Sequence, residues 1–182
     1  MATPAGTHSF GPGDASLTVK TYREGVAAKV GHDLIIEVQQ WDAMLELTDD
    51  PSRSRLELNA DPRSLHPREG LRGLKPLSDK DRGEIRKNID GKVLGTQPIA
   101  FRSNAVEAGS GDGRLTVRGE LTMAGATQPV SFDLRIAPGG EVTAATELVQ
   151  SDFGIKPYRG LMGALKVRDS LEVLFEGKLP AA

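Results

Sequence analysis

Apolar and polar residues alternate at period two in many separate stretches of this chain. Successive side chains of a β-strand point to opposite faces, so this alternation predicts strands that bury one face. In residues 41–47, for example, Trp41, Ala43 and Leu45 alternate with Asp42 and Met44. About eight or nine such segments occur, at residues 17–21, 34–38, 41–47, 56–60, 99–103, 115–123, 130–136, 142–148 and 171–177.

Turn-forming residues separate several of these segments. Glycine, proline, aspartate and serine fill residues 49–52, 109–113 and 138–140, and short loops of this composition connect antiparallel neighbours. We therefore predict a mainly β fold, an antiparallel β-barrel of about eight strands with one or two short helices. In this prediction residues 1–182 form a single domain, and residues 1–13 form a flexible N-terminal arm.

Residues 78–89 depart from the alternation and predict a helix. Ser78 is suited to cap its N-terminus, and acidic residues follow in the first turn, where the helix dipole favours them. Ile85 and Ile89 lie one turn apart on one face, and Gly91 is suited to end the helix. The preceding residues 61–77 are rich in proline and glycine and predict a long loop.

The composition excludes several kinds of site. The 182 residues contain no cysteine, so disulfides, thiolate metal sites and a cysteine nucleophile are excluded. A net charge of -2 gives no basic footprint for nucleic acid. The first residues lack a basic region followed by an apolar one, and no segment approaches the roughly 20 apolar residues of a membrane span. We therefore expect a cytoplasmic protein without an integral membrane segment.

Few residues are suited to catalysis or metal binding. The histidines His8, His32 and His66 are far apart and form no metal-ligand pair, and no Gly-x-Ser-x-Gly motif is present. The strand carboxylates fall on the polar sides, which is typical of a solvated face. We therefore predict no catalytic residue, no metal ligand and no cofactor. His32 lies at the start of an apolar strand, where its ring could form a structural hydrogen bond or contact a ligand head group.

Two segments leave alternatives open. Residues 151–165 are too apolar for a free loop, so they either plug one end of the barrel or cover a bound apolar ligand. Residues 63–92 carry nine basic side chains and five acidic ones. This charge excess forms either a solvated helix face or an electropositive rim that makes weak contact with an anionic head group or a membrane surface.

Four motifs occur in a distinctive order along the chain. Residues 31–34 are Gly-His-Asp-Leu, and residues 97–103 contain Pro-x-Ile-x-Phe-x-Ser. Residues 119–130 contain Gly-x-Leu-Thr followed by Gly-x-Thr-x-Pro-Val, and residues 152–155 and 167–173 complete the set. In this order the chain resembles the YceI-like family of lipocalin-like, polyisoprenoid-binding proteins. The resemblance implies a lipocalin-like barrel whose apolar lumen holds a long isoprenoid chain, such as a polyprenyl compound or a quinone tail.

The resemblance further implies a non-catalytic binding or carrier protein whose partner is a small apolar molecule, and it is compatible with a homodimer. Two alternatives are an enzyme that acts on a lipid or quinone in the same cavity and a ligand-free structural or stress-response barrel. The expected ligand-binding residues are His32, Leu34, Ile36, Trp41, Phe101, Leu121, Phe132, Phe153, Ile155, Tyr158 and Met162.

Overall fold

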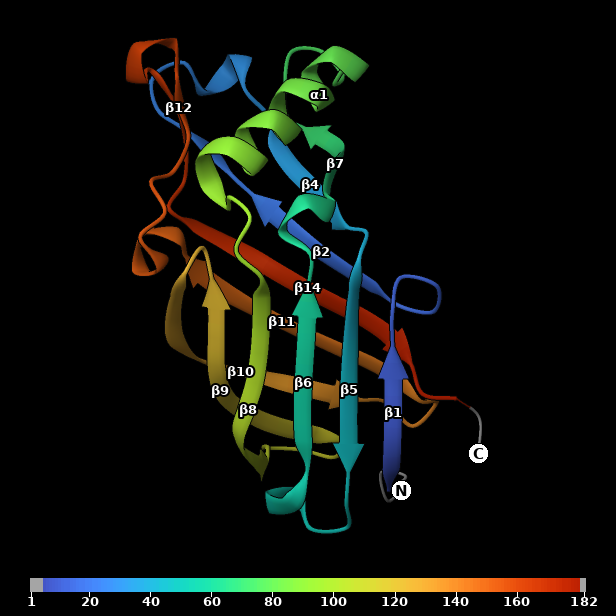
Figure 1. The fold of residues 1–182 in the computed structure, drawn as a ribbon. Helices are drawn as coiled ribbons and strands as arrows, with labels where there is room; N and C mark the ends of the chain where they lie inside the picture. The colour runs from blue at the N-terminus through green and yellow to red at the C-terminus, as the bar shows by residue number, and fades with distance from the viewer. Residues whose placement is uncertain (1–4, 181–182) are drawn as a thin grey trace.

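The computed structural model describes residues 5–180, and its main element is one antiparallel sheet of eleven strands (Figure 1). The strands follow the order β1-β5-β6-β8-β9-β10-β11-β14-β2-β4-β7, so β1 and β7 are the edges. Their bounds are β1 Gly6–Phe10, β2 Ser16–Thr21, β4 Asp33–Val38, β5 Trp41–Leu47, β6 Arg55–Ala60, β7 Leu65–Leu71, β8 Ile99–Ala108, β9 Arg114–Met123, β10 Ala126–Ile136, β11 Glu141–Val149 and β14 Ser170–Lys178.

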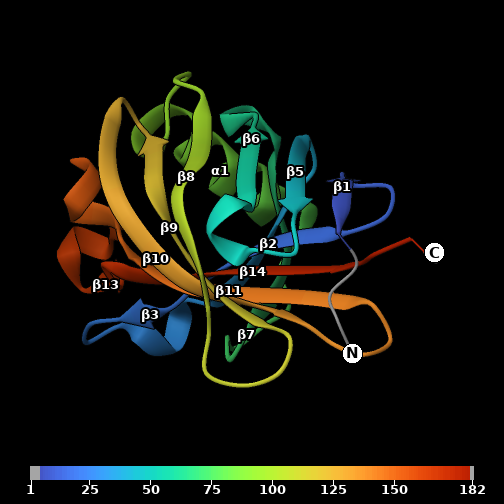
Figure 2. The ribbon, with the colours of Figure 1, turned by 90° about the horizontal axis from the view of Figure 1, so that it is seen from below.

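The sheet curls upon itself into a half-barrel. In Figure 1, β5, β6, β8 and β9 run upright at the front, while β11, β14 and β2 cross behind them at a steep angle. Viewed from below in Figure 2, the same strands wrap around a common interior. The mainly β, antiparallel prediction is confirmed, but the strand number is eleven rather than about eight. Within residues 5–180 the two edge strands do not pair with each other, so backbone hydrogen bonds do not close the ring.

The additional edge strands explain the difference in strand number. Strand β1 pairs with β5, and Phe10 at its end is buried, so residues 6–10 are not the flexible arm that we expected. The first four residues of that predicted arm lie outside the described residues. Strand β7 occupies much of the predicted loop 61–77 and pairs with β4. Its Pro67 lacks a backbone donor, which an edge strand tolerates, and this residue obscures the strand pattern in the sequence.

The predicted helix is present as α1 (Asp79–Asn88) and begins with a capping box. The Ser78 hydroxyl accepts a hydrogen bond from the Asp81 amide at 3.1 Å, and the Asp81 carboxylate accepts one from the Ser78 amide at 2.9 Å. The bounds of the helix agree with the predicted residues 78–89, but the helical conformation does not stop at Gly91 as predicted. It continues into a π-helical turn, η4 (Ile89–Val93), because Ile89 and Leu94 are both buried and hold the wider turn against the sheet.

A second, small sheet lies at the same end of the molecule as α1 (Figure 1). It contains β3 (Arg23–Glu24), β13 (Leu165–Val167) and β12 (Arg159–Gly160), paired in the order β12-β13-β3. Short 3-10 turns complete the described chain: η1 Ala28–Val30, η2 Pro51–Arg53, η3 Pro62–Ser64, η5 Gln150–Phe153 and η6 Leu161–Gly163. Among residues 5–180, no helix is both long enough and apolar enough to span a bilayer.

The pairing of β8 with β9 contains an irregularity that depends on a glycine. The register shifts between Ser103 and Ala105, and Gly119 lies opposite Ser103. A Cβ atom at Gly119 would lie only 2.3 Å from the carbonyl oxygen of Arg102, so no larger residue fits without a backbone shift. Irregularities of this kind increase local twist and bend, which favours the curling of the sheet.

Candidate ligand-binding cavity

The inner face of the curled sheet surrounds a cavity of about 700 Å³. Each of the eleven strands contributes at least one lining residue. Several inward-facing apolar side chains, including Val130, Phe132 and Leu171, are only partly buried although they point away from bulk solvent. A close-packed core would bury such side chains completely. Their accessible surface therefore lines open space inside the sheet.

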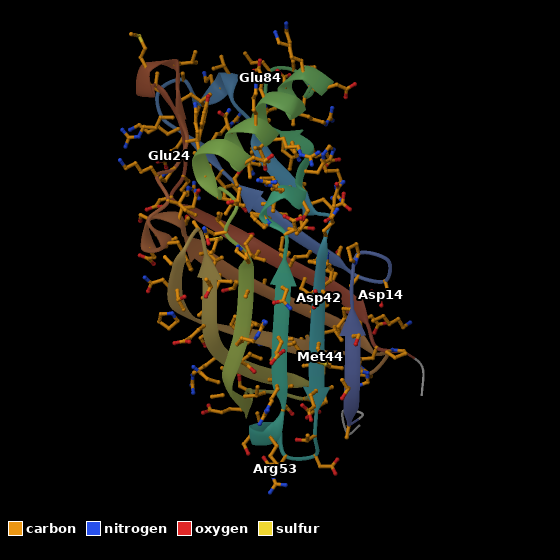
Figure 3. All side chains as sticks on the ribbon, in the orientation of Figure 1. Asp14, Glu24, Asp42, Met44, Arg53 and Glu84 are labelled. Atoms are coloured by element: carbon orange, nitrogen blue, oxygen red, sulfur yellow. The ribbon has the colours of Figure 1, made fainter. Side chains whose placement is uncertain are left out.

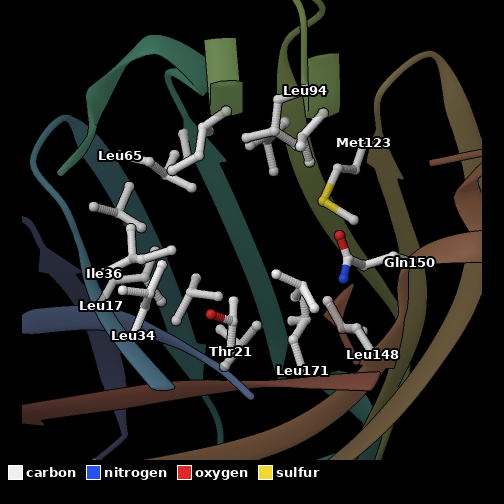
Figure 4. Close-up of a pocket in the computed structure, with 18 of the residues that line it drawn as sticks. Leu17, Thr21, Leu34, Ile36, Leu65, Leu94, Met123, Leu148, Gln150 and Leu171 are labelled. Atoms are coloured by element: carbon white, nitrogen blue, oxygen red, sulfur yellow. The ribbon is translucent and has the colours of Figure 1, made fainter. Parts of the chain in front are cut away.

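The cavity lining is predominantly aliphatic, as the close-up in Figure 4 shows. Leu17, Leu34 and Ile36 face Met123 and Leu148 across the open space. Two polar side chains lie among these apolar ones (Figure 4): Thr21 and Gln150 are both buried. The Gln150 side-chain amide donates a hydrogen bond to the Arg168 carbonyl at 3.1 Å, so its nitrogen already has a protein partner. This lining favours a mainly hydrocarbon ligand.

A packed layer closes one end of the cavity, near the loops 109–113 and 137–140. Val106 lies opposite Val117 in the β8–β9 pairing, and Leu115 lies opposite Leu134 in the β9–β10 pairing. Val117 is only 1% exposed, and the neighbouring Val106, Leu115 and Ile136 are also buried without lining the cavity. The open space therefore ends against this layer and extends toward α1.

Helix α1 and the turn η4 cover the opposite end. Ile85, Ile89 and Leu94 face the cavity from above the sheet. Arg82 fixes the helix to the edge strand, because its guanidinium donates to the Leu77 carbonyl at 2.8 Å and to the Arg68 carbonyl at 3.3 Å. Polar and charged side chains appear among the lining residues at this end: Arg23, His32, Lys75, Asp81, Glu84, Asn88 and Lys166. The cavity is therefore apolar inside and charged at its mouth.

A buried carboxylate connects three segments of the mouth. Asp33 accepts a hydrogen bond from the Arg23 backbone amide at 2.9 Å and forms an ion pair with Arg72 at 3.6 Å. The Arg23 guanidinium in turn donates to the Gly31 carbonyl at 2.8 Å and to the Arg72 carbonyl. Buried carboxylates need such partners to offset their lost hydration. The early segment around Arg23 and the loop after β7 are therefore held together.

Tyr22 lies next to this cluster. Burial, together with a hydrogen bond to the Glu172 carboxylate, raises the pKa of the Tyr22 phenol above its ordinary value of 10.0. The guanidinium of Arg168 lies 5.2 Å from the centre of the tyrosine ring. The Lys92 ammonium lies 6.0 Å from the ring centre of a second tyrosine, Tyr158. Aromatic rings therefore position cationic side chains at this end.

The structure places eight of the eleven predicted ligand-binding residues along the cavity. His32 and Tyr158 lie at the mouth, whereas the other six are apolar side chains of the walls. These six are Leu34, Ile36, Phe101, Leu121, Phe132 and Ile155. Phe101 and Phe132 also contact each other, with ring centres 5.4 Å apart.

Three predicted residues do not line the cavity. Trp41 is buried but packs edge-on against Phe175, with ring centres 5.8 Å apart, outside the open space. Phe153, the last residue of the turn η5, is buried in the core. Met162 is fully exposed, with a relative accessibility of 108%, because the left-handed backbone of η6 directs it outward. The apolar tail segment is therefore split between core, wall and surface.

His32 has a structural partner in the mouth. Its Nε2 atom is hydrogen-bonded to the Lys75 carbonyl at 2.5 Å. Its ring packs against two glycines, since a Cβ atom at Gly70 or Gly73 would lie within 2.8 or 2.1 Å of the imidazole. His32 therefore positions the loop after β7, and its Nε2 atom already has a partner within the protein.

Sequence reasoning missed many wall residues of β2 and β14. Leu17 and Val19 face Val173 and Phe175 across paired strands, and all four line the cavity. The sequence does show the alternation of these residues, in the predicted strands 17–21 and 171–177. It does not say whether the apolar set of a strand lines open space or packs in a filled core. Leu65 of β7 was missed because its strand was predicted as a loop.

The geometry of the cavity agrees with a family comparison. A model of the YceI-like domain matches residues 15–179. This chain belongs to the YceI-like family. The match begins just before β2 and ends after β14, so it covers ten of the eleven strands that line the cavity and leaves out β1.

Solved structures of BcnA and of YceI proteins are similar to this chain in fold. BcnA of Burkholderia cenocepacia is 16% identical, covers 89% of this chain and 94% of its own, and gives a TM-score of 0.63. A Campylobacter jejuni YceI protein, which crystallizes with large solvent channels, is 10% identical to this chain. The match covers 81% of this chain and 84% of that protein, with a TM-score of 0.56. A mutant of the CJ YceI protein with a monobromobimane guest is also 10% identical, has the same coverage and has a TM-score of 0.58. No curated protein matches this sequence.

Proposed function

We propose that this protein is a non-catalytic carrier that binds a long apolar lipid, of the isoprenoid type, inside the curled sheet. The observation that carries the proposal is the cavity of about 700 Å³ with aliphatic walls and a charged mouth. Small-molecule sites of this kind measure about 300–1,000 Å³ and bury most of the ligand. Membership of the YceI-like family, whose members are known as lipid- and polyisoprenoid-binding proteins, supports the same ligand class.

The size of the cavity favours a chain over a compact ligand. An apolar protein cavity of about 150 Å³ holds one benzene molecule, so this cavity accommodates several such volumes in succession. Burial of apolar surface contributes roughly 25 cal/mol per Å² whatever the shape of the hydrocarbon. The walls therefore supply affinity for a polyprenyl chain or a quinone tail. The charged residues of the mouth are the available partners for its polar end.

The chemistry of the mouth does not favour an enzyme. An enzyme acting in this cavity would need a titratable group at the mouth, and the Nε2 atom of His32 is engaged by the Lys75 carbonyl. Among residues 5–180, no group of three or more histidine, aspartate or glutamate side chains is arranged to hold a metal ion. We therefore propose binding without a chemical step. The cytoplasmic location and the homodimer remain predictions from the sequence.

Native mass spectrometry of the protein purified from its source tests the proposal. We expect a mass excess of one lipid, which denaturation and organic extraction release for identification by tandem mass spectrometry. Apoprotein should take up an added polyprenyl alcohol one-to-one. A protein that carries no extractable lipid and does not bind the added polyprenyl alcohol would contradict the proposal.

A further inference from the structure

Exposed apolar side chains are concentrated around the mouth of the cavity. Residues 5–180 contain seven large hydrophobic residues with exposed side chains, and six of them lie in three segments of the chain near the mouth. We call residues 23–33, 68–75 and 156–168 the rim. The six rim residues are Val26, Val30, Leu71, Leu74, Leu161 and Met162, and the seventh exposed residue is Met44 in strand β5.

The three rim segments are joined to one another, so these side chains occupy one end of the molecule. The Ala27 amide donates to the Ala164 carbonyl at 2.9 Å, which links the segment of Val26 to that of Met162. The contacts of Arg23 and His32 described above link the first segment to the loop after β7. Exposed apolar patches of this kind mark interaction surfaces more often than chance placement.

The backbone of the rim directs these side chains outward. Leu161 and Met162 have φ angles of 49° and 55°, in the left-handed region that residues other than glycine seldom adopt. Arg72, next to Leu71, has a φ of 59°. Only one other described non-glycine residue has a positive φ, in the hairpin turn between β9 and β10. Backbone conformations of this kind persist where a function favours them. Here they project Leu161 and Met162 into solvent.

The rim is strongly basic although the chain as a whole is slightly acidic. Its three segments contain nine basic side chains and three acidic ones, against a net charge of -2 for all 182 residues. The ten residues of α1 add four basic and three acidic side chains, so the excess persists when the helix is included. The basic rim residues are Arg23, Lys29, Arg68, Arg72, Lys75, Lys156, Arg159, Lys166 and Arg168.

We propose that the rim docks on an anionic lipid bilayer. Leu74, Leu161 and Met162 would enter the interface between head groups and acyl chains, and the flanking lysines and arginines would contact anionic head groups. Apolar side chains surrounded by basic ones are the combination that binds such interfaces. The cavity mouth then faces the bilayer, so a hydrocarbon chain can pass between the two without crossing water. Docking itself does not require an occupied cavity.

Charge favours a bilayer over a second copy of this chain. A two-fold dimer through the rim would place the same patch against itself. Each copy would then bring its excess of basic side chains toward the other, and like charges across an interface are unfavourable. An anionic bilayer presents the opposite charge to the same side chains. The observed excess therefore fits the membrane surface and opposes self-association.

Sedimentation with lipid vesicles tests the proposal on the full chain. We expect binding to vesicles of phosphatidylcholine with phosphatidylglycerol, weaker binding to phosphatidylcholine alone, and release in roughly 1 M salt, where the Debye length falls to about 3 Å. The double variant Leu161→Ser/Met162→Ser should lower the vesicle partition coefficient about tenfold, because two apolar side chains no longer enter the interface. The variant Lys29→Glu/Arg159→Glu should reduce binding to the anionic vesicles.

Two matched controls lie away from the rim. Figure 3 places Met44 on the wall of the sheet, and it places Arg53 at the end opposite Glu24 and Glu84. Met44→Ser and Arg53→Glu remove an exposed methionine and reverse an exposed charge without touching the rim, so both should bind vesicles like the unmodified protein. Circular dichroism establishes that each variant is folded. Equal loss of binding in Met44→Ser and in the rim variant would overturn the proposal.

Two other outcomes would overturn the proposal that the rim docks on a bilayer, and neither would contradict the carrier function. Binding that is equal on neutral and anionic vesicles would contradict the role of the basic residues. Self-association in sedimentation velocity that Leu161→Ser/Met162→Ser abolishes, without any vesicle binding, would assign the patch to a second copy. Retention of a polyprenyl alcohol, measured on the same variants, tests the carrier function separately because these residues do not line the cavity.

Discussion

Replacing Ala144 with phenylalanine distinguishes an open cavity from a packed core. Ala144 lies in the middle of β11, points inward, and stands opposite Phe175 in the β11–β14 pairing. The added phenyl ring needs about the volume of one benzene, roughly 150 Å³, and the cavity offers about 700 Å³. Burying such a ring contributes about 1.5–3 kcal/mol, and ordering the side chain opposes this by about 0.5–1 kcal/mol. We therefore expect the ligand-free variant to be more stable by about 1–2 kcal/mol.

Thermal unfolding and ligand titration measure the two consequences. For a chain of this length, 1 kcal/mol changes the Tm by about 2–4 °C, so the Tm of ligand-free Ala144→Phe should rise by about 2–8 °C. The same ring occupies space that the lipid needs. Displacing at least two methylene groups of a bound chain, at about 0.8 kcal/mol each, should raise the Kd for a polyprenyl alcohol more than about tenfold. Stability and affinity should therefore change in opposite directions.

The adjacent residue provides the control for added bulk. Thr143 is exposed on the outer face of the same strand, so Thr143→Phe should leave the lipid affinity unchanged. If the inner face were filled by side chains, Ala144→Phe would overpack it and reduce stability by about 1–3 kcal/mol. A fall in Tm for Ala144→Phe, without a comparable fall for Thr143→Phe, would refute the open cavity.

Three further substitutions test how the walls and the mouth are built. Gly119→Ala should destabilise the protein by about 1–3 kcal/mol in denaturant unfolding, because its Cβ atom meets the backbone of β8 at 2.3 Å. Ser78→Ala should remove about 1 kcal/mol of stability at neutral pH. Hydrogen bonds from the Ser78 amide and hydroxyl lower the pKa of Asp81 below its ordinary 3.8, so this carboxylate stabilises the fold above pH 3.8. Ser78→Ala keeps the amide bond and removes only the contribution of the hydroxyl, so this part of the difference should disappear as the pH falls below 3.8. His32→Ala should speed amide hydrogen exchange in the loop around Lys75 and leave lipid retention unchanged, whereas loss of retention would assign His32 to the ligand.

Strands with a regular alternation could be predicted from the sequence, and irregular ones could not. In β5 every second residue from Trp41 to Leu47 is buried, as the pattern indicates. The edge strand β7 contains Pro67 and Gly70 and only two fully buried apolar side chains, so its local sequence resembles a loop. Its strand conformation depends on pairing with β4. That pairing joins residues about thirty positions apart, which no local pattern encodes.

The outward projection of Met162 has the same kind of cause. An apolar residue in a segment that is otherwise too hydrophobic for a free loop is expected to be buried. Met162 is exposed because three consecutive residues, Leu161, Met162 and Gly163, adopt positive φ angles. Only one of the three is a glycine, so the sequence gives little indication of this turn. The prediction failed on backbone conformation rather than on hydrophobicity.

The cavity itself could not be derived from the alternation, because a packed core and an open lumen have the same inward-facing pattern. Whether an inward-facing side chain belongs to a packed core or lines an open lumen depends on which side chains surround it. Val106 and Val117 pair in a buried layer that does not line the cavity, whereas Phe132, which pairs with Val117 on its other side, retains accessible surface. The walls separate toward α1, which sits across the open end and is fixed by side-chain hydrogen bonds to the carbonyls of residues 68 and 77. Global curvature therefore decides where the interior is filled, and curvature depends on contacts between distant strands.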